Sequence, residues 1–194
     1  GLLTYGRATL GFGIPFDFKA GEGPRVEKPV RSRADIEALR RFEPREGLRT
    51  VLEAIRLLRG ELEVPLIGFA GAPFTLASYA IEGGHSNNFA RTKALMYGKP
   101  AAWHRLCERL AEMSTDYLSA QVDAGVDAVQ VFDSWVGALN ASDYREFLLP
   151  HTRRRHPRHR TDRRRETRRG RWRSRWRPRP PTWTGVRKTC ESSI

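Results

Sequence analysis

The stretch that decides the fold is Val64-Pro65-Leu66-Ile67-Gly68-Phe69-Ala70, a short apolar run bounded by turn-forming residues. Such a run is typical of a β-strand that is buried on both faces, as the strands of parallel sheets are. A second run of the same kind, Ala128-Val129-Gln130-Val131-Phe132, ends at Asp133-Ser134. We therefore expect residues 64–70 and 128–133 to be parallel strands of one sheet.

Capping residues and apolar residues at helical spacing predict four helices around these strands. The helices begin at Ser32, at Pro44, at Pro100 (with Gly125 as its C-terminal cap) and at Asn140. Residues 71–84 are predicted to be rich in loops around a single helical turn, and residues 1–31 to hold one short strand between loops. Strands that alternate with helices indicate parallel βα units, so the fold class is α/β.

Basic residues are concentrated at the end of the sequence. Residues 151–194 hold 17 of the 35 Lys and Arg residues but only 3 of the 22 Asp and Glu residues. Residues 1–150 are left with 18 basic and 19 acidic side chains, a formal charge of −1. The net charge of +13 therefore describes the terminal segment, and the folded part is not predicted to be a basic nucleic-acid-binding surface.

The basic segment also differs from the rest in its apolar content. Residues 151–194 contain no Leu, Ala, Phe, Tyr or Met, and no periodic apolar face can be drawn through them. A segment with so little to bury is expected to be disordered. The sequence thus predicts a folded part, residues 1–150, and an atypical tail rich in Arg, Pro and Trp, residues 151–194.

Several classes of protein and site are disfavoured by composition. The two cysteines, Cys107 and Cys190, do not form a disulfide framework and favour a reducing compartment, so we expect a cytoplasmic protein. The five histidines lack the spacing of a metal site, and structural or incidental roles are expected for them. No apolar run approaches the roughly 18 to 20 residues that a membrane-spanning helix needs.

The run Gly68-Phe69-Ala70-Gly71-Ala72-Pro73-Phe74-Thr75-Leu76, within residues 65–84, resembles a signature of the uroporphyrinogen decarboxylase family. The resemblance continues through residues 13–18, 92–97, 123–125, 131–137 and 143–150. It implies a (β/α)8 TIM barrel. Because such a barrel needs about 250 residues, the 150 family-like residues are expected to form only part of it.

The resemblance also implies an activity. Enzymes of this family remove carboxyl groups from the four acetate side chains of uroporphyrinogen to give coproporphyrinogen in heme biosynthesis, as homodimers and with no metal or organic cofactor. Tyr79 and Ser134 match positions that hydrogen-bond the substrate, and Phe132 matches an apolar residue against the macrocycle. From the residues alone, Tyr79 also fits a core or rim side chain and Ser134 a helix cap. Asp133 fits either a structural role or a supporting role beside the substrate.

Two parts of the family pattern have no counterpart in this sequence. They are an Arg-containing motif on the N-terminal barrel strand and an aspartate near the pyrrole N–H groups, which stabilises the cationic intermediate. His156 and His159, in the Arg-rich segment, do not correspond to the family's late histidine. We therefore assign no catalytic residue, and we expect this chain alone to be inactive.

Two alternatives belong to other functional classes. A related methyl-transferring barrel would use a zinc-bound thiolate, which requires a metal-binding cluster that the sequence lacks. A nucleic-acid-binding protein could use the Arg residues that alternate with Trp172, Trp176 and Trp183, because guanidinium groups contact phosphate and aromatic rings stack on bases. Any polycation binds nucleic acid at low salt, so only non-specific binding is expected.

The segment from about Arg154 onward is predicted to be an out-of-frame reading. Arg rises to 16 of 44 residues within a few positions of a family-like helix, and Arg, Pro and Trp together are typical of GC-rich DNA translated in the wrong frame. Translating the DNA after the Pro150 codon in the other two frames should restore a helical apolar pattern and further βα units. If neither frame does so, the segment is a binding arm.

Overall fold

A computed structural model describes residues 16–19, 23–40, 43–84 and 86–153. The elements are β1 (Phe16–Lys19), β2 (Gly23–Val26), α2 (Arg33–Ala38), α3 (Pro44–Gly47), α4 (Arg49–Glu61), β3 (Ile67–Gly71), α5 (Pro73–Glu82), α6 (Ala90–Gly98), α7 (Pro100–Ala124), β4 (Ala128–Phe132), the 3-10 helix η1 (Val136–Ala138), α8 (Ala141–Asp143), the π-helix η2 (Tyr144–Leu148) and α9 (Leu149–Thr152). The disorder and frame predicted for the tail concern residues 154–194, which lie outside the described residues.

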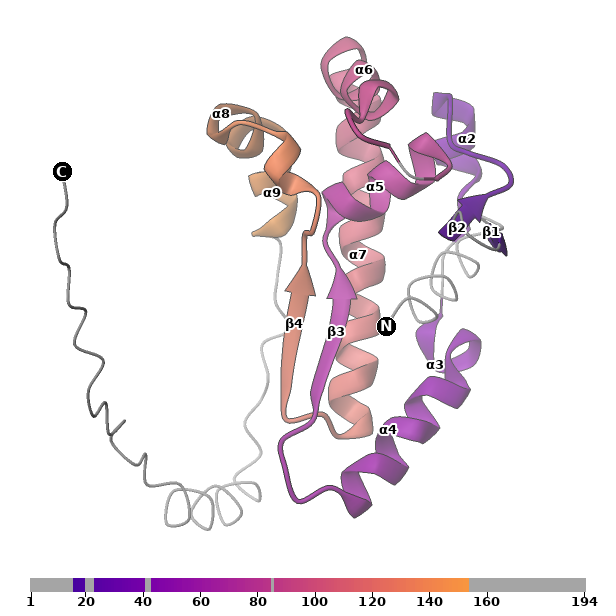
Figure 1. Cartoon of the computed structure of the whole chain (residues 1–194), viewed down its shortest axis with the longest axis vertical. Coiled ribbons are helices and arrows are strands. Elements are labelled where there is room, and N and C mark those ends of the chain that lie inside the picture. The colour runs from indigo at the N-terminus through magenta and orange to yellow at the C-terminus, as the bar shows by residue number, and fades with distance from the viewer. Residues whose placement is uncertain (1–15, 20–22, 41–42, 85, 154–194) are drawn as a thin grey trace, which may run out of the picture. The chain divides into compact units, whose positions relative to one another are not determined.

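The predicted parallel strand pair is confirmed. β3 and β4 pair in parallel, with Ile67 opposite Ala128 and Gly71 opposite Phe132, and they run side by side in Figure 1. β3 begins at Ile67 rather than at residue 64. Pro65 has no N–H to contribute to a ladder, and the N–H of Leu66 donates instead to the carboxylate of Asp127 at 3.0 Å.

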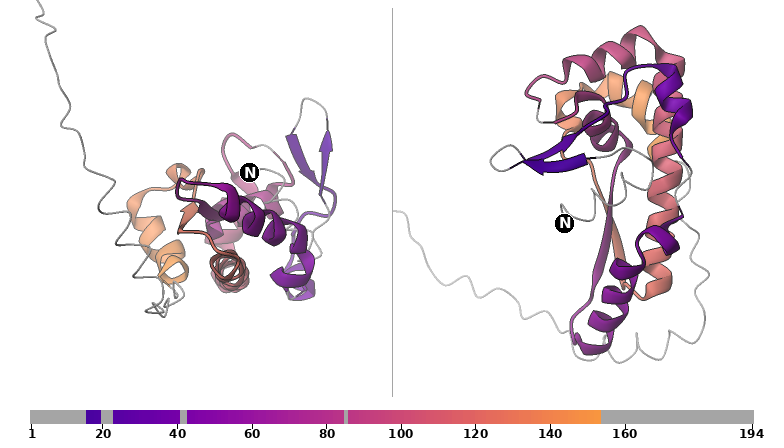
Figure 2. Two further views of the ribbon diagram at one scale, coloured as in Figure 1. Left: turned by 90° about the horizontal axis from the view of Figure 1, so that it is seen from below. Right: turned by 90° about the vertical axis from the view of Figure 1, so that its right-hand side faces the viewer.

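The long helix α7 covers one face of this sheet, so that helix and sheet form two layers (Figure 2). It begins at Pro100 and is capped by Gly125, whose φ of +116° favours glycine, as predicted. Two of its side chains bind the β3 backbone. The Ser114 hydroxyl donates to the carbonyl of Gly71 at 2.9 Å, and the Gln121 amide both accepts from and donates to the backbone of Phe69.

The opposite face of the sheet is more open among the described residues. Ile67 is 59% exposed and Phe132 is 44% exposed, whereas Ala70, whose side chain points toward α7, is buried. The expectation that both strands are buried on both faces is therefore wrong for the part of the chain that the structure describes, because α7 covers one face only. Within that part, no helix combines the length and the apolar character that a membrane span requires.

The first described elements form a hairpin and a capped helix. β1 and β2 are antiparallel, with Phe16 opposite Val26, whereas the sequence predicted one strand followed by a loop. The second strand was not predicted because its Gly and Pro residues interrupt the alternation of apolar and polar residues that indicates a strand. The predicted capping box at the start of α2 is confirmed, because Ser32 and Asp35 exchange backbone-to-side-chain hydrogen bonds of 3.2 and 2.7 Å.

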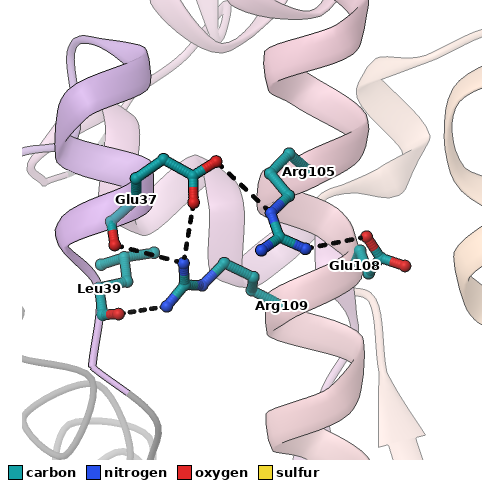
Figure 3. Close-up of polar contacts among 5 residues, drawn as sticks. All are labelled: Glu37, Leu39, Arg105, Glu108 and Arg109. Carbon is teal, nitrogen blue, oxygen red and sulfur yellow. Dashed lines mark hydrogen bonds and ion pairs between the residues drawn. The ribbon is translucent and has the colours of Figure 1, made fainter.

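Charged side chains attach α2 to α7 (Figure 3). The carboxylate of Glu37 pairs with Arg105 at 3.5 Å and with Arg109 at 3.4 Å, and Arg105 also pairs with Glu108. The guanidinium of Arg109 donates to the carbonyl of Leu39. Isolated surface ion pairs contribute little to stability, but the Arg109 side chain is only 17% exposed, so its contacts are partly shielded from water.

Helices α5 and α6 differ from the sequence expectation. The region predicted to be rich in loops contains the continuous helix Pro73–Glu82, which ends at Gly83 with a φ of +82°. Nearly all its side chains are buried, so it has no amphipathic period to reveal it, and its Pro at the first position is a usual helix start. Helix α6 was not predicted either, because its apolar residues follow no helical stripe.

Close packing of β3 on α7 leads to a prediction for two glycines. A Cβ at Gly68 would lie 2.7 Å from Oε1 of Gln121 and 3.1 Å from Val126, whereas a Cβ at Gly60, within α4, would meet nothing within 4 Å. Gly68→Ala should lower the free energy of unfolding by about 1 to 3 kcal/mol through overpacking. The matched control Gly60→Ala should raise it by up to about 1 kcal/mol, because alanine favours helix. Urea unfolding measures both, and equal effects would contradict the packing described.

Candidate functional site

The three predicted substrate-binding residues lie at the same end of the sheet. Phe132 is the last residue of β4, Ser134 follows it by two positions, and Tyr79 lies on α5, which begins directly after β3. These are the carboxyl ends of neighbouring parallel strands, and α/β sheets bind ligands at this edge. All three therefore lie at or just beyond this edge of the sheet.

Tyr79 is held by a neighbouring aromatic ring. Its ring centroid lies 4.1 Å from that of Trp135, with 35° between the ring planes. The side chain is partly buried, and this burial raises the pKa of the Tyr79 phenol above its ordinary value. The phenol is therefore neutral near pH 7, where it can both donate and accept a hydrogen bond.

Phe132 and Ser134 supply an apolar surface and a hydroxyl. The ring of Phe132 meets the ring of Phe69 edge to face, with centroids 5.7 Å apart, on the face of the sheet away from α7. Ser134 is exposed at the start of the turn after β4. An exposed aromatic ring, a hydroxyl and a phenol at the same edge of the sheet suit a ligand that has both a flat apolar body and polar substituents.

Asp133 connects β4 to α5. Its Oδ1 accepts hydrogen bonds from the backbone N–H of Thr75 at 3.1 Å and from the Thr75 hydroxyl at 2.8 Å. Thr75 lies in the first turn of α5, where backbone N–H groups have no partner within the helix, so the carboxylate caps the helix that carries Tyr79. Of the two roles left open for Asp133, the structural one is present, and it fixes two parts of the candidate site to each other.

The environment of Asp133 is largely buried. Burial raises the pKa of this carboxyl, while the hydrogen bonds from Thr75 oppose part of the rise. Burial, and then the nearby Asp133 charge, also hold the pKa of Cys107 well above its usual value. Cys107 is therefore a protonated, buried thiol of α7, which is a packing residue rather than a nucleophile.

Trp135 and Thr75 belong to the site but were not singled out from the sequence. A Thr three residues into a helix is a usual capping position, yet its partner comes from a strand end 58 residues later, which no local pattern reveals. Trp135 follows Ser134 directly and could have been noticed as a bulky ring beside a candidate substrate contact.

Two histidines, on α7 and α9, contact each other. Nδ1 of His104 is 2.9 Å from Nε2 of His151, and the His104 ring stacks on Phe147 with centroids 6.0 Å apart. His85, His156 and His159 lie outside the described residues. Among the residues that are described, no three His, Cys, Asp or Glu side chains are grouped closely enough to hold a metal ion.

Known proteins resemble this chain over most of its length. Residues 9–165 match the model of the family described as Uroporphyrinogen decarboxylase (URO-D), past the predicted boundary at residue 150. A Thermus thermophilus protein named uroporphyrinogen decarboxylase is 56% identical over 144 residues, which is 74% of this chain and 42% of the relative. A Sorangium cellulosum protein of the same name is 57% identical over 143 residues, 73% of this chain and 41% of the relative. The chain thus spans about two fifths of the length of these curated relatives.

The burial of Asp133 predicts a specific pH dependence. The pKa of Asp133 is higher in the folded chain than in the unfolded chain, so ionisation of this carboxyl opposes folding. The stability that the protonated carboxyl allows is therefore fully present below the unfolded pKa and is lost as the pH rises through the folded pKa. Asp133→Asn should remove this loss and still accept from Thr75, so it should be at least as stable as the native chain at pH 7.

The matched variant Asp133→Ala separates the hydrogen bonds from the charge. It leaves the N–H and hydroxyl of Thr75 without their acceptor and should cost about 1 to 3 kcal/mol of unfolding free energy. Urea unfolding of both variants between pH 3 and pH 8 is the measurement. An alanine variant as stable as the asparagine variant would mean that Asp133 does not cap α5.

Proposed function

The chain belongs to the uroporphyrinogen decarboxylase family, and we propose that it forms part of the substrate site of an enzyme that decarboxylates the four acetate side chains of uroporphyrinogen. The product is coproporphyrinogen, and the enzyme is a carboxy-lyase of heme biosynthesis. The observation that carries the proposal is the gathering of Tyr79, Phe132 and Ser134 at the carboxyl ends of β3 and β4. These are the residues that match the family's substrate contacts.

Each of the three side chains has a separate task. Phe132 lies on the open face of the sheet and packs against the macrocycle, which excludes water from one side of a pyrrole ring. The neutral phenol of Tyr79 and the hydroxyl of Ser134 donate hydrogen bonds to substrate carboxylates. Such contacts orient one acetate group at a time, which a substrate with four acetate side chains requires.

The reaction needs groups beyond these three. Decarboxylation releases CO2 and leaves a proton in its place, and protonation of a pyrrole carbon supplies the electron sink for the bond that breaks. None of the three can stabilise the resulting cation by charge, and the family's aspartate and arginines have no counterpart in this sequence. Loss of one electrostatic stabiliser typically lowers the rate about 10²- to 10³-fold, so this chain alone turns over uroporphyrinogen at a negligible rate.

Other parts of the family fold supply the rest of the site. We place the chain in a (β/α)8 barrel whose other βα units cover the open face of β3 and β4, in a homodimeric enzyme of the cytoplasm. The parallel β3–β4 pair with its covering helix supports the barrel, and the buried, protonated Cys107 is consistent with a reducing compartment.

Neither alternative function gains support from a described residue. The zinc-dependent methyl-transferring barrel requires a metal-binding cluster, and the described residues contain none. Nucleic-acid binding rests on Arg and Trp residues beyond residue 153, outside the described part of the chain. The relatives named above carry the name of the decarboxylase.

A hybrid enzyme tests the assignment. In it, the 144 aligned residues of the Thermus thermophilus relative are replaced by those of this chain. The hybrid should decarboxylate uroporphyrinogen, whereas the 194-residue chain alone should not. Tyr79→Phe and Ser134→Ala should each lower kcat/KM by about 10- to 100-fold, because each removes one hydrogen bond to a charged group.

The matched control is Tyr97→Phe. Tyr97 is exposed, its hydroxyl donates a hydrogen bond to Asp143 on α8 at 2.7 Å, and it has no place in the proposed site. Its kcat/KM should stay close to that of the hybrid. An active hybrid in which Tyr79→Phe and Tyr97→Phe behave alike would overturn the role of Tyr79.

A further inference from the structure

A strained residue lies beside the candidate site. Phe89 has φ +53° and ψ +39°, and among the described residues it is the one non-glycine residue with positive φ. The left-handed region is unfavourable for a bulky side chain, so the surrounding structure must hold it there. Its backbone N–H donates to the hydroxyl of Ser86 at 3.0 Å, which closes the turn before α6.

The strained backbone turns the Phe89 ring into the protein. The residue is 7% exposed, and its ring centroid lies 5.3 Å from that of Trp135 and 6.0 Å from that of Phe74. Trp135 in turn contacts the ring of Tyr79 at 4.1 Å. One indole therefore contacts both the strained phenylalanine and the candidate substrate-binding tyrosine.

Carboxylates fix both ends of the helix between these residues. Asp133 caps the start of α5 through Thr75, as described above. At the end of α5, Oε1 of Glu82 accepts from the backbone N–H and the hydroxyl of Thr92, both at 2.8 Å, and so caps the first turn of α6. Phe89 immediately precedes that turn, and its ring returns to Trp135, two residues after Asp133.

We propose that Phe89 is a positioning residue for Tyr79, acting through Trp135. Three contacts link these segments in turn: Asp133 at the end of β4 binds α5, Glu82 of α5 binds the start of α6, and Phe89 at the start of α6 contacts Trp135, the residue after Ser134. Within this set of contacts, the Phe89 ring stops Trp135 from moving away from Tyr79. The strained backbone at Phe89 places its ring against the indole, and the fixed helices on either side hold it in that conformation. The inference rests on the proposed function in one respect, because that function gives Tyr79 a substrate to bind.

A purely structural role for Phe89 makes a different prediction. A buried ring that only fills the core would lower stability when removed and leave the Tyr79 ring where it is. A positioning ring would change the environment of Tyr79 in any variant that shortens it, whether or not stability falls in proportion. The two roles are therefore separated by observing Tyr79 directly.

The experiment uses the 194-residue chain labelled with 3-fluorotyrosine and observed by ¹⁹F NMR. The Tyr79 and Tyr97 resonances are assigned by their loss in Tyr79→Phe and Tyr97→Phe. The variants are Phe89→Ala, Phe89→Gly and Phe89→Leu. Phe147→Ala is the control, because Phe147 is 6% exposed, similar to Phe89, and its ring contacts Tyr97 at 5.7 Å.

In Phe89→Ala and Phe89→Gly, the Tyr79 resonance should move toward that of free 3-fluorotyrosine, and its titration should shift to lower pH as burial decreases. Phe89→Leu should restore part of the native position. Phe89→Gly should be more stable than Phe89→Ala, because glycine adopts the left-handed backbone without strain, yet both should displace Tyr79 equally. Phe147→Ala should move the Tyr97 resonance and leave that of Tyr79 in place.

An unmoved Tyr79 resonance in folded Phe89→Ala and Phe89→Gly overturns the proposal. If neither variant folds, Phe89→Leu decides it by the same readout, because leucine is not branched at Cβ and keeps much of the buried volume while it removes the ring; a Tyr79 resonance at its native position in that variant would then overturn the proposal. In the hybrid enzyme, Phe89→Ala should lower kcat/KM and Phe89→Leu should recover part of it. A moved resonance with unchanged kcat/KM would leave the positioning intact and count against the proposed function of Tyr79.

Discussion

The two hydrogen bonds that Thr75 donates to the carboxylate of Asp133 hold the candidate site together. The N–H of Ala72, just before α5, also donates to the carbonyl of Phe132 at 2.8 Å, but the Asp133 carboxylate binds within the first turn of the helix itself, and hydrogen bonds fix direction as well as distance. Oδ1 accepts from both the N–H and the hydroxyl of one residue, so the carboxylate determines where the helix starts and how it is rotated. Tyr79 lies about one turn further along that helix, and Phe132 and Ser134 flank the carboxylate itself.

The same device occurs again at the next helix. Glu82 accepts from the N–H and the hydroxyl of Thr92, just as Asp133 does from Thr75. In both cases a carboxylate satisfies an N–H that the helix itself leaves unpaired, and both threonines are buried. This repetition explains how a loop with a strained residue such as Phe89 persists, since the helices on both sides of it are fixed.

Local patterns in the sequence predicted the sheet and its covering helix but not the site's connections. Apolar runs predicted β3 and β4, and Ser32, Pro100 and Gly125 marked helix ends correctly, because each of these signals acts over a few residues. Helix α5 was missed because it is buried on nearly every side and shows no amphipathic period. The contact of Phe89 with Trp135 could not be read at all, because a positive φ at phenylalanine depends on tertiary packing. Tyr79, Phe132 and Ser134 were found through the family resemblance.

A double-mutant cycle between Thr75→Val and Asp133→Ala tests the central claim most directly. Valine preserves the shape of threonine and removes the hydroxyl. The unfolding free energies of the two single variants and the double variant are compared with that of the native chain, and the difference from additivity measures the hydroxyl–carboxylate hydrogen bond. If Asp133 holds α5 through Thr75, the two changes should be coupled by about 1 kcal/mol or more. Additive effects within about 0.3 kcal/mol would contradict the claim, because residues that do not interact show no coupling beyond that.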